Sequence, residues 1–288
     1  MNKPHRDTIF LEEAEILSHQ AFDGGQHILR MQAPECANHA QPGSFVHLQV
    51  DPQRPLRRPI SIMRVSASSG WVELLYKTVG AGTKLLANRK PGEKISILGP
   101  IGQPFNTSAR RPLLIGGGVG MPPMIFLAER LRDKADTHPF VILGSEVPFP
   151  FRPEPSKILI PGLPGEVIGA QPLLDSWGIP SRLTSLQGYP GCFDGYVTDL
   201  ARHWLTSLDD VIRAEVEILS CGPHPMLEAV AALANEFSLP CQVSLEEFMA
   251  CGVGGCAGCV VPVRSETTQT MQRVCVDGPV FDANQVFF

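Results

Sequence analysis

Four cysteines near the end of the sequence form its clearest chemical pattern. Cys251, Cys256 and Cys259 follow the spacing C-x4-C-x2-C, and Cys275 comes after 15 further residues. Four glycines stand between the first and third cysteines. Glycine lets a backbone wrap closely, so that N–H groups can point at sulfur. Because thiolates are ligands for soft metal centres, we predict that these four cysteines bind metal.

The spacing separates two kinds of metal centre. Plant-type [2Fe–2S] ferredoxins use C-x4-C-x2-C and a distant fourth cysteine. Structural zinc sites more often use paired C-x2-C units. This chain has one such unit, extended by the glycine-rich x4 spacing. We therefore predict a [2Fe–2S] cluster, with structural zinc as the alternative, and expect the lone Cys36, Cys192 and Cys241 to be small buried residues.

Two short segments are typical of loops that face a nucleotide. A glycine-rich run follows an apolar stretch and precedes Pro122, where a helix is expected to begin. Cys221-Gly222-Pro223 has the same context a hundred residues later. N–H groups at such junctions can face a pyrophosphate, and a parallel sheet would bring both loops to its carboxyl edge. The alternatives are a tight strand-to-helix turn and, for His224, a solvent-facing position. The glycines are Gly116, Gly117, Gly118 and Gly120.

Three segments of the first hundred residues could hold another ligand. Arg58 with Ser61 at a strand edge is a plausible anion clamp. Tyr76 can present a flat face to a ring system, and Gly82-Thr83 opens a short helix whose N–H groups could meet a phosphate. Each has a structural alternative: a surface charge for Arg58, a core position for Tyr76 and a helix cap for Thr83.

The elements that must position these residues change at about residue 110. Before it, short strands at 45–50, 60–65, 71–79 and 94–98, with one helix at 83–89, predict a small antiparallel barrel. After it, strands at 113–115, 140–143, 182–186 and 215–220 alternate with helices from 122, at 196–208 and at 223–237, which predicts a parallel sheet. Gln242–Glu247 is also strand-like. Residues 145–169 hold six prolines and are expected to form a long surface excursion.

Length and composition are consistent with this division. The 288 residues carry a net charge of −5, which argues against a nucleic-acid partner. The N-terminus has no apolar run typical of a signal peptide. The longest uncharged run, residues 112–128, is too short and too rich in proline and glycine to cross a membrane. We expect a cytoplasmic protein of three domains: 1–108, 109–238 and 239–288.

The combined motifs resemble a known family. Arg58-Pro59-Ile60-Ser61, Leu75-Tyr76-Lys77 and Gly82-Thr83 resemble the FAD-binding barrel of the ferredoxin reductase superfamily. The glycine-rich loop and Cys221-Gly222-Pro223 with Met226 resemble its nicotinamide-nucleotide domain. Leu245-Glu246-Glu247 before Cys251, with the run from Arg273 to Phe281, looks like the electron-transfer subunit of NAD-dependent dihydroorotate dehydrogenases. The resemblance covers nearly the whole chain.

The resemblance implies an oxidoreductase subunit with FAD, NAD(H) and a [2Fe–2S] cluster. It implies a hetero-oligomer in which an FMN-containing dihydroorotate dehydrogenase subunit of pyrimidine biosynthesis exchanges electrons with the cluster. No side chain is assigned a general acid or base role. The cofactor-binding residues that it implies are Arg58, Pro59, Ile60, Ser61, Leu75, Tyr76, Lys77, Gly82, Thr83, Gly116, Gly117, Gly118, Gly120, Cys221, Gly222, Pro223 and Met226.

Two departures from the family lie in the nucleotide domain. The proline-rich excursion lengthens the chain, and Leu186-Gln187-Gly188 stands where many relatives carry an acidic pair before a glycine. The choice between NAD and NADP, the direction of electron flow and the partner therefore stay open. The alternatives are a reductase subunit for a sulfide dehydrogenase, hydrogenase or transhydrogenase, and a zinc-stabilised binding module without catalytic function.

Overall fold

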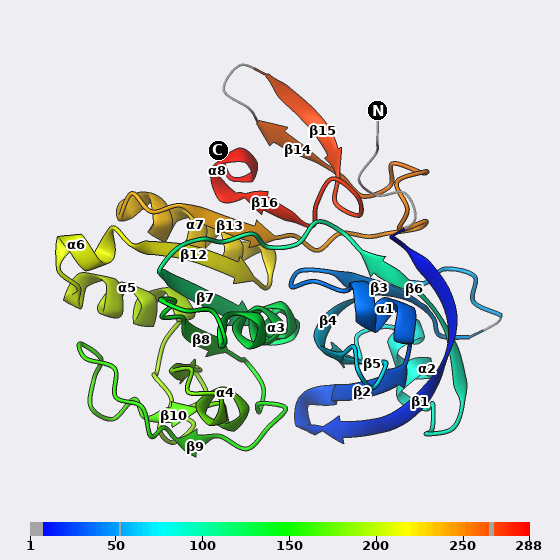
Figure 1. Ribbon diagram of the computed structural model, residues 1–288, viewed down its shortest axis with the longest axis horizontal. Coiled ribbons are helices and arrows are strands. Elements are labelled where there is room, and N and C mark those ends of the chain that lie inside the picture. The colour runs from blue at the N-terminus through cyan, green and yellow to red at the C-terminus, as the bar shows by residue number, and fades with distance from the viewer. Residues whose placement is uncertain (1–7, 52, 265–267) are drawn as a thin grey trace.

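The computed structural model describes residues 8–51, 53–264 and 268–288. Its first part is a closed antiparallel barrel with strand order β1-β2-β5-β4-β3-β6 (Figure 1). Alternating residues of β3, such as Val46 and Leu48, fill the barrel interior. The predicted barrel is confirmed, and β1 and β2 are strands that the sequence patterns did not delimit. The elements are β1 (Phe10–Phe22), η1 (Asp23–Gly25), β2 (Gln26–Gln32), α1 (Pro34–His39), β3 (Phe45–Gln49), β4 (Arg58–Ser66), β5 (Trp71–Lys77), α2 (Ala81–Ala87) and β6 (Lys94–Ile101).

The second part is a six-stranded sheet of order β11-β8-β7-β12-β13-β16. Every pair is parallel except β13 with β16, which is antiparallel. The predicted alternation of strands and helices is therefore confirmed. The elements are β7 (Arg111–Gly117), η2 (Gly118–Gly120), α3 (Met121–Leu131), β8 (Phe140–Gly144), α4 (Pro172–Ser176), β11 (Ser181–Thr184), α5 (Val197–Ser207), α6 (Asp210–Arg213), β12 (Val216–Cys221), α7 (His224–Glu236), β13 (Cys241–Ser244) and β16 (Val280–Asp282).

The two faces of this sheet bury different partners. Leu113 and Ile115 of β7 join a core with residues of α5 and α7. Leu114, which points to the other face, joins a core with α3 and with Met63 and Leu75 of the barrel. Helix α3 therefore lies between the sheet and the barrel, as Figure 1 shows.

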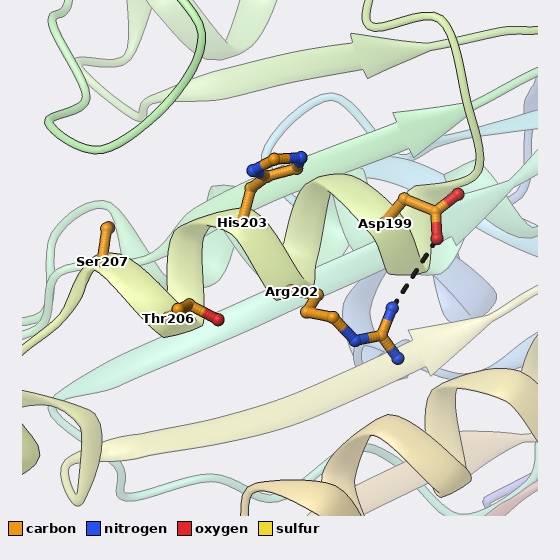
Figure 2. Close-up of a pocket in the computed structure, with 5 residues that line it drawn as sticks. All are labelled: Asp199, Arg202, His203, Thr206 and Ser207. Carbon is orange, nitrogen blue, oxygen red and sulfur yellow. Dashed lines mark ion pairs between the residues drawn. The ribbon is translucent and has the colours of Figure 1, made fainter.

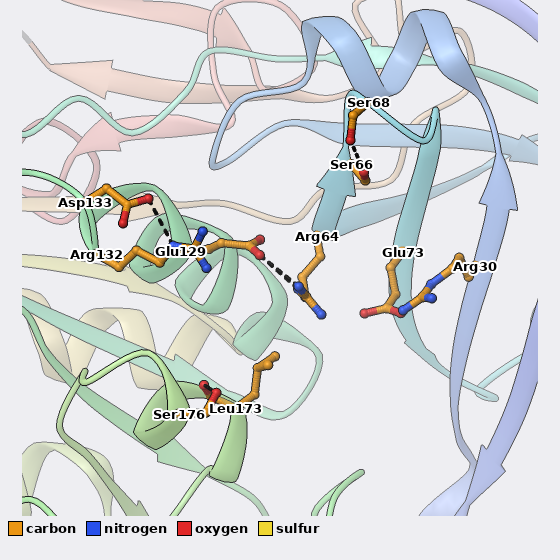
Figure 3. Close-up of polar contacts among 10 residues, drawn as sticks. All are labelled: Arg30, Arg64, Ser66, Ser68, Glu73, Glu129, Arg132, Asp133, Leu173 and Ser176. Carbon is orange, nitrogen blue, oxygen red and sulfur yellow. Dashed lines mark hydrogen bonds and ion pairs between the residues drawn. The ribbon is translucent and has the colours of Figure 1, made fainter.

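A polar cluster fixes the same interface (Figure 3). The guanidinium of Arg64 on β4 pairs with Glu129 of α3 at 2.9 Å. It also lies 5.2 Å from the ring centroid of Trp177 and 5.7 Å from that of Trp71. One cation therefore links the barrel, α3 and the end of α4, which favours a constant arrangement of barrel and sheet.

The proline-rich excursion runs mostly without regular structure, as expected. Its regular part is the strand pair β9 (Glu154–Pro155) and β10 (Gly169–Ala170). The buried Arg182 of β11 anchors the excursion: its Nη2 donates a hydrogen bond to the carbonyl of Ile158 at 2.8 Å. Near its start, Pro148 accepts a hydrogen bond from Gln26 of the barrel at 2.6 Å. The excursion thus contacts both parts of the molecule.

The cysteine-rich segment leaves the central sheet and returns to it. It runs from β13 through the hairpin of β14 (Val260–Arg264) and β15 (Gln269–Arg273) to β16, and α8 (Ala283–Val286) follows. Cys259, Val274 and Cys275 share a core with the sheet and α7. The boundary expected at residue 239 groups β13 and β16 with this segment, although both strands hydrogen-bond within the central sheet.

Among the described residues, none of the helices is both long and apolar enough to pass through a membrane.

Candidate functional site: a thiol cluster beside a flavin-type barrel

The fold brings the four predicted metal ligands together in two pairs. The side chains of Cys251 and Cys256 interact with each other, and so do those of Cys259 and Cys275. Cys256 is exposed, whereas Cys259 and Cys275 are buried. In the described part of the chain, no three His, Cys, Asp or Glu side chains close around a single ion. Two pairs of thiols match the two irons of a [2Fe–2S] cluster, which is held by four cysteines.

The electrostatics of the thiols fit a metal centre. Burial alone would raise the pKa of Cys251, but the N–H groups of Val253, Cys256 and Gly255 lower it to about 7. Burial raises the pKa of Cys275 to about 12, and the adjacent Cys259 adds to that rise. Two neighbouring thiolates repel each other unless positive charge lies between them, and iron ions supply that charge. The residues present therefore fit the cluster.

Arg273 and Asp277 support the loop that carries the first three cysteines, residues 251–259, called the ligand loop below. Arg273 donates from Nη1 to the carbonyl of Gly254 at 3.0 Å. Its Nε and Nη2 donate to the two oxygens of Asp277, at 2.9 and 3.1 Å. Asp277 also accepts from the backbone N–H of Arg273 at 2.8 Å. This arrangement fixes the loop beside the cysteines, a role that the sequence motif could not assign to either residue.

The ligand loop rests on the barrel at His47, which the sequence analysis missed. The strand alternation of β3 turns this side chain away from the barrel interior, and yet it is fully buried. Burial lowers the pKa of His47 to about 4, with the cation of Arg57 contributing. The imidazole is therefore neutral where it meets Gly252 of the loop.

The first predicted cofactor segment lies on β4, the neighbour of β3. Arg58, Pro59 and Ser61 are half-buried, and Ile60 is buried. The guanidinium of Arg58 lies against Gly82 at the start of α2. Thr83 closes the first turn of that helix, accepting from the N–H groups of Val79 and Gly80 at 3.0 and 3.2 Å. The fold thus places Arg58 next to Gly82-Thr83, so that these residues could contact the same ligand.

The segment Leu75-Tyr76-Lys77 is divided between two environments. Leu75 faces the core shared with α3, and Lys77 is half-buried. Tyr76 is buried in the barrel, where its ring stacks on His27 at 5.0 Å and its hydroxyl lies 2.8 Å from Nε2 of His19. The Tyr76 ring therefore occupies a core position, which is the structural alternative that the sequence offered for it.

The two nucleotide-type loops meet at the carboxyl edge of the sheet. Gly116 pairs with Cys221 in the parallel ladder of β7 and β12. Gly120 lies so close to the carbonyl of Cys221 that any side chain there would collide with it. Met226 fills the space next to Gly117 and Gly222. Gly118 and Pro223 complete this junction, and Pro223 is exposed.

Two residues near these loops have different surroundings. The side chain of Glu246, which follows β13, is exposed, yet desolvation by the surrounding protein raises the pKa of its carboxyl. Its charge in turn raises the pKa of the buried Cys221 thiol beyond the effect of burial. Glu246 is a residue beside these loops that the sequence motif named without a role. His224 is exposed, as expected, and lies 3.4 Å from Glu228.

Known proteins are similar in sequence to this chain over most of its length. The family model for the iron-sulfur cluster binding domain of dihydroorotate dehydrogenase B matches residues 246–287. The electron transfer subunit of dihydroorotate dehydrogenase B (NAD(+)) from Geobacillus sp. is 32% identical over 96% of this chain and 98% of the relative. The subunit of the same name from Shouchella clausii is 37% identical over 86% of each chain.

This chain belongs to the family of dihydroorotate dehydrogenase B electron transfer subunits. Its fold is also that of solved reductases. An NADH-dependent reduced ferredoxin-NADP oxidoreductase matches with a TM-score of 0.77 at 24% identity, over 96% of this chain and 90% of that one. The ferredoxin reductase of carbazole 1,9a-dioxygenase matches with a TM-score of 0.62 at 20% identity, over 81% and 67% of the chains.

Two surface pockets of this family member lie apart from the predicted cofactor residues. One, of about 490 Å³, is lined by one face of α5, where Asp199 and Arg202 form an ion pair at 3.6 Å (Figure 2). The other, of about 470 Å³, lies between the amino ends of β7 and β8 and the proline-rich excursion. None of the predicted cofactor residues lines either pocket.

Proposed function

We propose that this chain passes electrons between NAD(H) and the FMN of a dihydroorotate dehydrogenase catalytic subunit, through FAD and a [2Fe–2S] cluster. The observation that carries the proposal is the placement of four paired thiols against a flavin-type barrel, within a chain of this family. FAD held on the barrel would supply the conversion between two-electron transfer with the nicotinamide and one-electron transfer with the cluster. The protein binds and orients these groups.

We assign the binding roles by position in the fold. Arg58 to Ser61, Leu75 to Lys77 and Gly82 with Thr83 would hold FAD on the barrel. The glycine-rich loop, Cys221-Gly222-Pro223 and Met226 would hold the nicotinamide nucleotide. Cys251, Cys256, Cys259 and Cys275 would hold the cluster. In the proposed division, a barrel, a nucleotide domain and a cluster segment carry one cofactor each, and β13 and β16 join the last two.

The loop that carries the first three cysteines also offers a surface to the partner. Phe248 is 94% exposed and Val253 is 48% exposed. Exposed apolar side chains next to a redox centre favour a protein interface that brings two centres close. We propose that the FMN-containing subunit docks there. None of the eight cysteines, all within the described residues, forms a disulfide, which supports the proposed cytoplasmic location.

Purification and reconstitution test the function. The chain, co-expressed with the dihydroorotate dehydrogenase subunit encoded in the same genome, should carry FAD and two irons per chain. It should reduce NAD when dihydroorotate is added. A colourless chain with one zinc would contradict the cofactor assignment. A cofactor-loaded chain that binds no dihydroorotate-oxidising subunit would instead support a reductase for another partner, such as a sulfide dehydrogenase, hydrogenase or transhydrogenase.

A further inference from the structure

The imidazole of His47 is a buried polar group that the proposed function does not use. It stands on the outer face of β3, where a side chain would meet solvent if nothing covered the barrel. It is 0% exposed because the cysteine loop covers it. Neither ring nitrogen has a hydrogen-bond partner, a state that is costly for a buried polar side chain.

The surroundings of the ring point toward the cluster ligands. Its nitrogens face the carbonyl groups of Arg57 and Cys251, without full hydrogen-bond geometry to either. Gly252 makes room for the ring. With φ of +68°, it adopts the left-handed conformation, and a Cβ there would lie 2.6 Å from Nδ1 of His47. The loop and the imidazole therefore fit each other closely.

The ring also lies one strand from the proposed flavin site. His47 pairs with Pro59 across the ladder of β3 and β4, and the next pair is Leu48 with Arg58. A single side chain thus contacts the loop of the first cysteine and stands beside the segment assigned to FAD.

We propose that His47 is a positioning residue for electron transfer between FAD and the cluster. The imidazole seats the backbone of Cys251 and Gly252 on the barrel, and its single N–H, directed at the Cys251 carbonyl, polarises the peptide beside the ligand sulfur. In this role the imidazole would act only through the backbone that it seats, and FAD and the cluster would supply the electron transfer when both are bound. This inference rests on the proposed function, since it requires both groups in one chain.

Three variants of the full chain with bound FAD and cluster test the role. His47→Leu removes the ring nitrogens, His47→Asn keeps one N–H near Nδ1, and His39→Leu is the matched control on α1. His39 is exposed; it hydrogen-bonds to the carbonyl of Glu35 within its helix, and its ring lies 4.7 Å from that of Phe10. The readouts are the EPR spectrum of the reduced cluster, its midpoint potential, and the rates of FAD and cluster reduction after mixing with NADH.

For His47→Leu we expect cluster reduction to slow at least tenfold relative to FAD reduction in the same traces. The equilibrium between FAD and cluster should shift about tenfold, or about 59 mV for one electron, with altered EPR g-values. His47→Asn should restore part of both, and His39→Leu should match the wild type. An unchanged rate ratio, potential and EPR spectrum in His47→Leu would overturn the inference.

Gly252→Ala provides a second approach to the same contact. The added methyl group would press on Nδ1 of His47, so we expect the same direction of change in the EPR spectrum and potential. If His47→Leu fails to fold, an unaltered cluster in Gly252→Ala rejects the role. A wild-type chain whose FAD is not reduced by NADH would instead reject the proposed function, so the two failures are distinguishable.

Discussion

Two glycine-rich segments of this chain serve different purposes. Residues 252–258 form a largely exposed loop, in which left-handed Gly252 turns the backbone so that N–H groups reach a thiol. Residues 116–120 are largely buried, and Gly120 lets two backbones cross at Cys221. The first segment uses glycine both for left-handed backbone and for close contact with His47, whereas at Gly120 of the second segment glycine is needed because no side chain fits. A glycine-rich pattern therefore identifies a close approach without saying what is approached.

The largest effect should come from removing a thiol of the exposed loop. Cys256→Ser should reduce the iron content from two per chain to near zero, because serine is a poor ligand for iron–sulfur clusters. FAD should remain bound, since Cys256 lies outside the barrel. Iron analysis and EPR measure the loss, with Cys192→Ser as the control. Retention of both irons in Cys256→Ser would remove it from the ligand set.

A smaller effect is expected where the backbones of Gly120 and Cys221 pass close to each other. Gly120→Ala would drive a methyl group into the Cys221 carbonyl, at a cost of about 1–3 kcal/mol for overpacking. The two nucleotide loops should separate, and the affinity for NADH should fall about tenfold while the cluster spectrum stays unchanged. Titration of flavin reduction with NADH measures this. Gly165→Ala, whose side chain would meet open space, is the matched control; equal affinity in both variants would refute the close approach.

The support of the exposed loop by Arg273 and Asp277 should matter less than a ligand. Arg273→Gln removes the charged donor to Gly254 and Asp277. Loss of an outer-shell partner typically weakens metal binding about 10–100-fold, so cluster loss to a chelator should accelerate by a similar factor. Absorbance decay in EDTA follows it. Arg264→Gln on β14, which contacts the Phe288 ring instead, should keep the wild-type rate. Identical decay in both variants would deny this support.

The smallest effect is expected at the interface of barrel and sheet, which involves neither glycine-rich segment. Arg64→Ala removes the cation between Glu129 and Trp177 at the interface of barrel and sheet. We expect a loss of about 1 kcal/mol, or a lowering of Tm by about 2–4 °C, with the cluster and NADH affinity intact. Differential scanning calorimetry measures it against Arg202→Ala, whose ion pair with Glu236 is more exposed. A stability equal to that of the control would show that apolar packing alone joins the two parts.

The sequence predicted local features well where residue type alone sets them. The spacing of the four cysteines predicted a set of thiols that the fold brings together in two pairs, and the helix expected to begin at Pro122 is α3, which begins at Met121. It did not delimit β1 and β2, because polar and apolar residues do not alternate clearly in them: Leu11 and Leu17 of β1, for example, are exposed. It also could not show that β16 returns to the central sheet, since that pairing joins strands 36 residues apart and depends on tertiary contacts.

The sequence by itself determined the chemistry: four thiols at a ferredoxin-type spacing, glycines at two strand-to-helix junctions, and the family motifs. The tertiary structure decided how these groups serve one another. It paired the thiols, placed Arg58 against Gly82, stacked Tyr76 in the core, and put His47 beneath the ligand loop. The physical reason is that residue type sets what an atom can bind, whereas burial and neighbours come from segments distant in the chain.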